Sequence, residues 1–141
     1  MSYYRYTIFS CKRFFTSKPW SYKEAFQWQQ SFNRQQIPKE DISISFNRSS
    51  GPGGQNVNKV NTKVELRLSL SKKINWIPDY AIERLLKRTN KNGELIITSD
   101  KTRSQTKNID DCYHKLVDMI KDSVSVSKEP DQATLQRIEQ L

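Results

Sequence analysis

The sequence has 141 residues, a hydrophobic share of 35% and a mean hydropathy of −0.82, which indicates one domain with a modest core and a polar surface. No apolar run approaches the ~18 residues of a membrane-spanning helix, so no membrane partner is expected. Cys11 and Cys112 are too few and too far apart for a disulfide framework or a Cys-x-x-Cys metal site, which favours a reducing compartment.

The net charge of +9 is concentrated in two parts of the chain. Residues 1–23 carry five basic side chains and no acidic one, and residues 42–107 carry 13 basic and 5 acidic ones. Residues 108–141 carry 4 basic and 7 acidic side chains. A basic surface of this kind suits contact with phosphate backbones, and a solvated basic face without a ligand is the alternative.

The N-terminal segment, residues 1–18, is basic, rich in hydroxyl and aromatic side chains, and free of acids. This composition is that of a mitochondrial transit peptide, with removal expected near Phe14 to Lys18, and it predicts a matrix location. The alternative is a disordered basic arm that stays attached. Residues 19–37 are expected to be a linker or an N-terminal arm, in which Ala25, Trp28 and Phe32 are spaced for one side of a short helix.

Two strands with period-two alternation follow. Ile42, Ile44 and Phe46 alternate with serines, which predicts a half-buried strand. The stretch from Val64 to Leu70 places four apolar residues in alternation with Glu, Arg and Ser, which predicts a second strand. Between them, Val57 and Val60 have the spacing of one short helical turn.

The connection between these strands contains the run Gly51-Pro52-Gly53-Gly54-Gln55-Asn56. Adjacent glycines permit positive φ and close approach to a ligand, and Pro52 stiffens the entry. The run offers a neutral amide and backbone N–H groups, with no acid and no nucleophile. Such a tip is suited to positioning a water and stabilising an oxyanion. A glycine-rich hairpin turn without a further role is the alternative.

The rest of the chain predicts helix, strand and helix. Pro78 and Asp79 suit a helix start, and the helix is expected to run to about Lys91, with Asn92-Gly93 as its cap. Glu94 to Ser99 reads as a third strand. From Gln105 onward, helical spacing of apolar residues predicts a long amphipathic helix whose buried side is Ile109, Cys112, Tyr113, Leu116 and Ile120. The order β-β-α-β-α predicts an α+β fold over residues 38–124, followed by a flexible C-terminal extension, 125–141.

The block around the glycine run resembles the catalytic domain of class I peptide-chain release factors, the GGQ domain. The resemblance is carried by Arg48-Ser49-Ser50-Gly51-Pro52-Gly53-Gly54-Gln55, continued by Asn56-Val57-Asn58-Lys59-Val60-Asn61-Thr62, and by Arg103-Ser104-Gln105 at the start of the last long helix. It covers roughly Ile37 to Ser123 and is most similar to the small codon-independent members, the mitochondrial and bacterial ribosome-rescue peptidyl-tRNA hydrolases.

The resemblance implies hydrolysis of the ester between a nascent peptide and tRNA on a stalled mitochondrial ribosome. Gly53, Gly54 and Gln55 are then the catalytic residues, water is the nucleophile, and no cofactor or metal is needed. The implied partners are the large-subunit ribosomal RNA and the peptidyl-tRNA, with a monomer expected off the ribosome. The implied RNA-contacting residues are Arg48, Ser49, Ser50, Asn56, Asn58, Lys59, Asn61, Lys63 and Arg103.

The sequence departs from the small rescue members at its C-terminal end. Those proteins carry a long, strongly basic tail, whereas this sequence ends in SKEPDQATLQRIEQL, so the tail is missing or the chain has been cut short of it. The departure puts in doubt how a stalled ribosome is recognised. It leaves open an alternative function, a non-catalytic protein that binds the mitochondrial ribosome or its RNA with the same fold.

Overall fold

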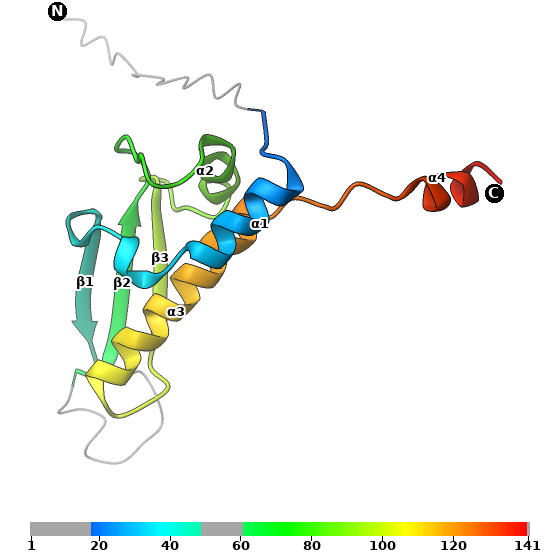
Figure 1. Cartoon of the computed structure of the whole chain (residues 1–141). Helices are drawn as coiled ribbons and strands as arrows, with labels where there is room; N and C mark the ends of the chain where they lie inside the picture. Colours follow the sequence, from blue (N-terminus) through cyan, green and yellow to red (C-terminus); the bar gives the residue numbers. More distant parts are fainter. Residues whose placement is uncertain (1–17, 49–60, 141) are drawn as a thin grey trace, which may run out of the picture.

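The computed structural model describes residues 18–48 and 61–140, and it is built on a three-stranded sheet (Figure 1). The strands are β1 (Ile42–Asn47), β2 (Lys63–Ser69) and β3 (Glu94–Ser99), in the order β1-β2-β3 with both pairs antiparallel. The two strands predicted from alternation and the third strand predicted at Glu94 to Ser99 are therefore confirmed, and the fold is α+β as expected.

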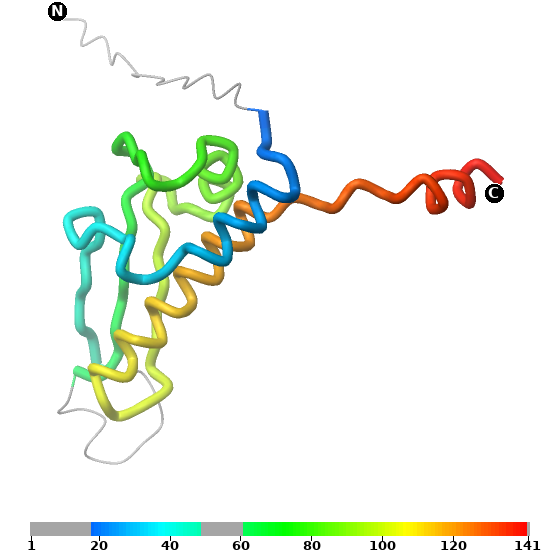
Figure 2. The backbone as a smooth tube through the Cα atoms, in the orientation of Figure 1, coloured from blue at the N-terminus to red at the C-terminus, as the bar shows by residue number. Residues whose placement is uncertain are grey.

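One face of the sheet forms the core and is covered by α3 (Gln105–Val124) (Figures 1 and 2). Leu66 of β2 lies opposite Ile44 of β1 and Ile97 of β3, so apolar side chains of the three strands share this face. Val64, Leu66 and Leu68 are fully buried against α3 residues on the predicted apolar stripe. Of that stripe, Cys112, Leu116 and Ile120 are fully buried, whereas Ile109 and Tyr113 are half-buried.

The second helix, α2 (Asp79–Leu86), is shorter than predicted. The expected extension to about Lys91 is wrong because the chain after Leu86 turns into 3₁₀-type hydrogen bonds, with the Thr89 hydroxyl donating to the Leu86 carbonyl at 2.8 Å. The Asn90 side chain then accepts the backbone N–H groups of residues 92 and 94. Asn and Thr favour such local bonds over a helix, and Gly93 closes the turn with φ of +73°.

The segment expected to be a linker or an N-terminal arm contains α1 (Tyr22–Ser31) and the 3₁₀ turn η1 (Arg34–Gln36). Ser21 and Glu24 form a capping box at the start of α1. The side of α1 predicted from spacing faces the protein, and Ala25 and Phe32 belong to the same core as the sheet.

A row of aromatic side chains fastens α1 to the rest of the domain. Trp28 stacks on Phe32 with ring centroids 4.5 Å apart, and Phe32 stacks on Trp76 at 6.0 Å. Trp20 meets Tyr80 of α2 edge-on at 6.0 Å. The Tyr80 hydroxyl donates to the Val124 carbonyl at 2.8 Å, and burial raises the pKa of this phenol. Trp76 and Tyr80 thus serve packing of the domain.

The remaining elements are the 3₁₀ turn η2 (Lys39–Asp41) before β1 and α4 (Gln132–Glu139). Figure 1 shows α4 apart from the sheet and its covering helices, at the end of an extended segment. Every described residue from 127 to 140 is exposed. Within the described part of the chain, no helix is long and apolar enough to cross a membrane.

Candidate functional site

The predicted site falls largely in the connection between β1 and β2. The residues Ser49, Ser50, Gly53, Gly54, Gln55, Asn56, Asn58 and Lys59, and the helical turn expected at Val57 and Val60, lie outside the described residues. Of the predicted site, the structure describes Arg48, Asn61, Lys63 and Arg103.

These four residues gather at one end of the sheet. Arg48 directly follows β1, and Lys63, the first residue of β2, is the cross-strand partner of Asn47. Arg103 lies in the turn from β3 to α3, and this turn is bonded to the start of β2 through Asn108. The β1–β2 connection therefore begins and ends beside the first turn of α3, a position we call the loop root (residues 47–48, 61–63 and 102–108).

Asn108 is the hydrogen-bonding centre of the loop root. Its side chain is fully buried on the core side of α3. The amide Nδ2 donates to the carbonyls of Thr62 at 2.6 Å and Thr102 at 2.8 Å. The amide Oδ1 accepts from the backbone N–H of Thr102 at 3.0 Å and from its hydroxyl at 2.9 Å. One side chain thus ties α3, the β3–α3 turn and the last residue before β2 together.

Gln105 adds a second tie at the loop root. Its side-chain amide donates to the carbonyl of Asn61, next to the carbonyl that Asn108 holds. Two consecutive backbone carbonyls at the end of the β1–β2 connection are thus held by side chains of one helical turn. The resemblance pointed to Gln105 through Arg103-Ser104-Gln105, but the sequence reasoning gave neither Gln105 nor Asn108 a role at the site.

A signal for Asn108 was nonetheless present in the sequence. Asn108, Cys112 and Leu116 recur every four residues on the core side of α3, so the asparagine stands on an otherwise apolar stripe. A polar side chain at such a position has to be hydrogen-bonded inside the protein. Its partners, which are backbone groups distant in sequence, could not be read from the sequence.

Asp111, one helical turn from Asn108, fastens the end of β3 to α3. Its carboxylate lies 2.8 Å from Lys101 Nζ and 2.9 Å from Lys115 Nζ, and it accepts a hydrogen bond from the Ser99 hydroxyl at 2.8 Å. The hydrogen bonds from Lys101, Lys115 and Ser99 hold the pKa of this carboxyl well below its usual range. Asp111 is therefore an ionised structural acid and is unsuited to proton transfer near neutral pH.

The surface around the loop root is basic. Arg48, Arg103 and Lys107 are exposed and form no ion pair among the described residues, whereas Lys101 is neutralised by Asp111. Arg103 thus has no carboxylate partner among the described residues, which leaves its guanidinium available to an external anion. Phe46, expected to be half-buried in β1, is 42% exposed at the same end. Guanidinium and ammonium groups presented in this way are suited to RNA phosphates.

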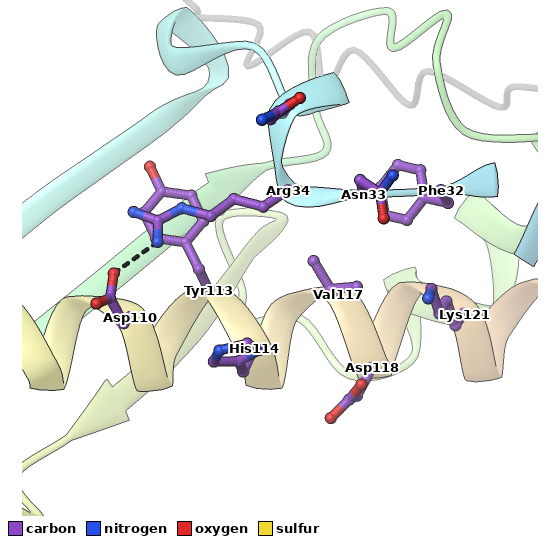
Figure 3. Close-up of a pocket in the computed structure, with 10 residues that line it drawn as sticks. Phe32, Asn33, Arg34, Asp110, Tyr113, His114, Val117, Asp118 and Lys121 are labelled. Atoms are coloured by element: carbon purple, nitrogen blue, oxygen red, sulfur yellow. Dashed lines mark hydrogen bonds and ion pairs between the residues drawn. The ribbon is translucent and has the colours of Figure 1, made fainter. Parts of the chain in front are cut away.

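A separate groove of about 490 Å³ lies between η1 and α3 (Figure 3). Arg34 is ion-paired to Asp110 at 2.6 Å, and its guanidinium lies 3.9 Å from the centre of the Tyr113 ring. His114 also lines this groove, but no serine or cysteine does. The groove thus joins η1 to α3 by charge and stacking, and the neighbouring carboxylates Asp110 and Asp111 are paired with different cations.

No group of three or more His, Cys, Asp and Glu side chains in residues 18–48 and 61–140 is placed to hold a metal ion. The chemistry that the described loop root can provide is binding of phosphate and rigid support for the connection that contains Gly53-Gly54-Gln55.

Comparison with known proteins gives a match to the RF-1 domain over residues 30–140. The chain is 44% identical over 108 residues to the large ribosomal subunit protein mL62 of Mus musculus, an alignment that covers 72% of this chain and 52% of the relative. It is 35% identical over 92 residues to the peptidyl-tRNA hydrolase ArfB of Pseudomonas putida, covering 62% and 66% respectively.

A shorter match, 61% identical over 31 residues, is to the chloroplastic peptide chain release factor PrfB1 of Arabidopsis thaliana, covering 22% of this chain and 7% of the relative. The chain spans about half the length of the mouse relative. Because the RF-1 match takes in both the β1–β2 connection and α3, the chain belongs to the RF-1 domain family, the family of the class I release factor GGQ domain.

Proposed function

We propose that this protein is a ribosome-dependent, codon-independent peptidyl-tRNA hydrolase that releases nascent chains from stalled mitochondrial ribosomes. The observation that carries the proposal is the run Gly53-Gly54-Gln55 in the β1–β2 connection of an RF-1 domain. The names of two relatives support it, a peptidyl-tRNA hydrolase and a protein of the large ribosomal subunit. The mitochondrial location rests on the basic, acid-free residues 1–18.

In the proposed reaction, water attacks the carbonyl carbon of the peptidyl-tRNA ester. A C–O bond to water forms, the bond to the tRNA ribose oxygen breaks, and the proton lost by water ends on that leaving oxygen. The backbone N–H of Gln55 stabilises the oxyanion that develops, a donor of the kind worth about 3–4 kcal/mol. The Gln55 amide shapes the space for water, and Gly53 and Gly54 permit the backbone to approach the ester closely.

The loop root supports this chemistry without taking part in it. Asn108 and Gln105 hold the carbonyls of Thr62 and Asn61, which fixes where the connection returns to the sheet at β2. Arg48 and Arg103 form no ion pair with any residue that the structure describes, and both are exposed at this end of the sheet, suited to the ribosomal RNA around the reacting ester. Much of the catalytic environment would then be RNA, which agrees with the lack of a described general base beside the loop root.

A second candidate function is a non-catalytic protein that docks on the mitochondrial ribosome. The relative named as a large ribosomal subunit protein favours it, as does the C-terminal segment, in which Glu129, Asp131 and Glu139 outnumber Lys128 and Arg137. The intact Gly53-Gly54-Gln55 favours the hydrolase, because docking alone does not require a neutral amide after two glycines.

The test is release of labelled peptide from mitochondrial ribosomes that hold peptidyl-tRNA in the P site and no stop codon. The full chain, Gln55→Ala and Gly54→Ala are compared, and ribosome binding is measured in parallel. We expect both variants to lose release while ribosome binding persists. Gly54→Ala should lose at least about 100-fold, because an added Cβ displaces the Gln55 backbone N–H from the oxyanion. Gln55→Ala keeps that N–H and should lose release because it removes the amide that shapes the space for water.

The matched control is Gln27→Ala, because Gln27 is exposed on α1 and its side chain makes no described hydrogen bond. It should release peptide like the parent chain. Binding without release, even after a basic tail is added to the C-terminus, would contradict the hydrolase and leave the docking protein.

A further inference from the structure

We infer that the end of the domain opposite the loop root is a second RNA-binding surface, which contacts the phosphate backbone of an RNA helix. The surface, here called the lysine surface, consists of Lys72 and Lys73 after β2 and Lys87 and Lys91 after α2. All four side chains are exposed, and none forms an ion pair among the described residues.

Backbone hydrogen bonds hold the two lysine-bearing connections together. The N–H of Leu70 donates to the Gly93 carbonyl at 3.0 Å, which extends the β2–β3 ladder beyond the strands. Gly93 also lies beside Ser71 in the connection after β2. A Cβ added at Gly93 would lie 3.8 Å from Ser71 Cβ. Figures 1 and 2 show both connections at the same end of the sheet.

The turn that carries Lys91 is fixed by its own hydrogen bonds. Asn90 Oδ1 accepts the N–H groups of Asn92 at 3.0 Å and Glu94 at 2.9 Å, and the N–H of Gly93 donates to the Asn90 carbonyl at 3.1 Å. With Gly93 in the left-handed region, this geometry presents Lys91 on a preorganised backbone. Ordering the backbone therefore adds little to the cost of binding there.

The acidic groups near this surface are few or already engaged. Glu94 is held by Arg67 at 3.5 Å and by the Asn90 amide at 3.4 Å. Glu83 lies one turn before Lys87 on α2 without an ion pair between them. Arg88 is excluded from the lysine surface because it lines a shallow groove with Asp118 and Asp122 of α3. The four lysines thus provide a net positive surface.

The side chains indicate which part of an RNA is bound. The aromatic residues closest in sequence, Trp76 and Tyr80, are held in the aromatic row, so none of the surface's own residues can stack on an unpaired base. Lysines alone read phosphate charge and no base edge. The expected ligand is therefore the backbone of a duplex. β2 has seven residues, so the lysine surface and the loop root are separated by roughly 20 Å.

The experiment measures the salt dependence of binding of the full chain to an RNA hairpin whose stem is two helical turns long. The variant Lys72→Gln/Lys73→Gln/Lys87→Gln/Lys91→Gln is compared with Lys18→Gln/Lys23→Gln/Lys39→Gln/Lys128→Gln, which removes the same charge from exposed lysines elsewhere. We expect the slope of log K against log salt to become shallower by about 3 to 4 for the first variant. The control should change it by less than about 1.

Equal changes in the two variants would overturn the proposal, because binding would then follow net charge alone. Competition by poly-glutamate as effective as competition by the hairpin would also overturn it, in favour of an acidic protein partner. Preference for an unpaired RNA of equal length would overturn the assignment of a duplex. Because the readout is binding, its result is independent of whether the protein releases peptide.

Discussion

At the scale of single residues, the most consequential side chain outside the Gly-Gly-Gln run is Asn108. It is fully buried, and all of its described partners belong to Thr62 and Thr102, backbone or hydroxyl groups of two connections. A buried side chain that is hydrogen-bonded to groups in two separate connections fixes the position of one connection relative to the other. If either connection moved, its buried polar groups would lose their hydrogen-bond partner. The loop root is therefore positioned by polar contacts within an apolar core.

We expect Asn108→Ala to lower the free energy of unfolding by about 2–4 kcal/mol. The variant loses several buried hydrogen bonds and leaves the Thr62 and Thr102 carbonyls unsatisfied. Urea denaturation followed by circular dichroism measures the loss. The control is Asn75→Ala, an exposed asparagine with no described hydrogen bond, which should stay within about 0.5 kcal/mol of the parent. An equal effect of the two substitutions would contradict this account.

At the scale of elements, apolar periodicity predicted the elements that are set by packing against the core. It did not predict the end of a helix that is set by side-chain hydrogen bonds. β1, β2 and α3 were found because apolar residues such as Leu66 and Leu116 follow the period of a strand or of a helix. The end of α2 was predicted too late in the chain because the side chains of Thr89 and Asn90 bond to nearby backbone groups, and these bonds compete with the helix. The apolar pattern does not indicate where this competition begins.

For the arm around α1 as well, spacing predicted the helix but did not predict its packing partner. The spacing of Ala25, Trp28 and Phe32 predicted a helix and its inner side, but the sequence alone did not tell whether that side had a partner. The structure supplies one, because the Phe32 ring lies between Trp28 and Trp76 and is only 1% exposed. The C-terminal end of α1 is thus part of the domain core.

We expect Phe32→Ala to lower the free energy of unfolding by about 3–5 kcal/mol, the usual cost of removing a buried phenylalanine ring. Phe26→Ala is the matched control on the same arm. Phe26 is 48% exposed and Tyr22 is its only ring contact among the described residues, so the expected cost is below about 1 kcal/mol. Thermal and urea unfolding of both variants measure these losses in the free energy of unfolding. Similar losses would mean that α1 is not anchored through Phe32.

At the scale of the whole molecule, the described residues form one packed body and an exposed C-terminal segment. The body runs from the aromatic row of α1 to Val126, which packs against the core, and the family match extends past it to residue 140. Both basic surfaces belong to the body, at opposite ends of the sheet, so a body that folds without α4 would keep both of them.

Three shortened chains test this division, namely 18–141, 37–141 and 1–128. The chain 1–128 should unfold at the same urea concentration as the parent, because residues 129–140 are exposed in their entirety. The chain 37–141 should lose most of a typical domain stability of about 5–15 kcal/mol, because it lacks the buried Ala25 and Phe32 and the partly buried Trp20 and Trp28. The chain 18–141 isolates the effect of removing residues 1–17. A lower unfolding midpoint for 1–128 would show instead that α4 stabilises the body. Equal stability of 37–141 and 18–141 would show that α1 does not contribute to the stability of the domain.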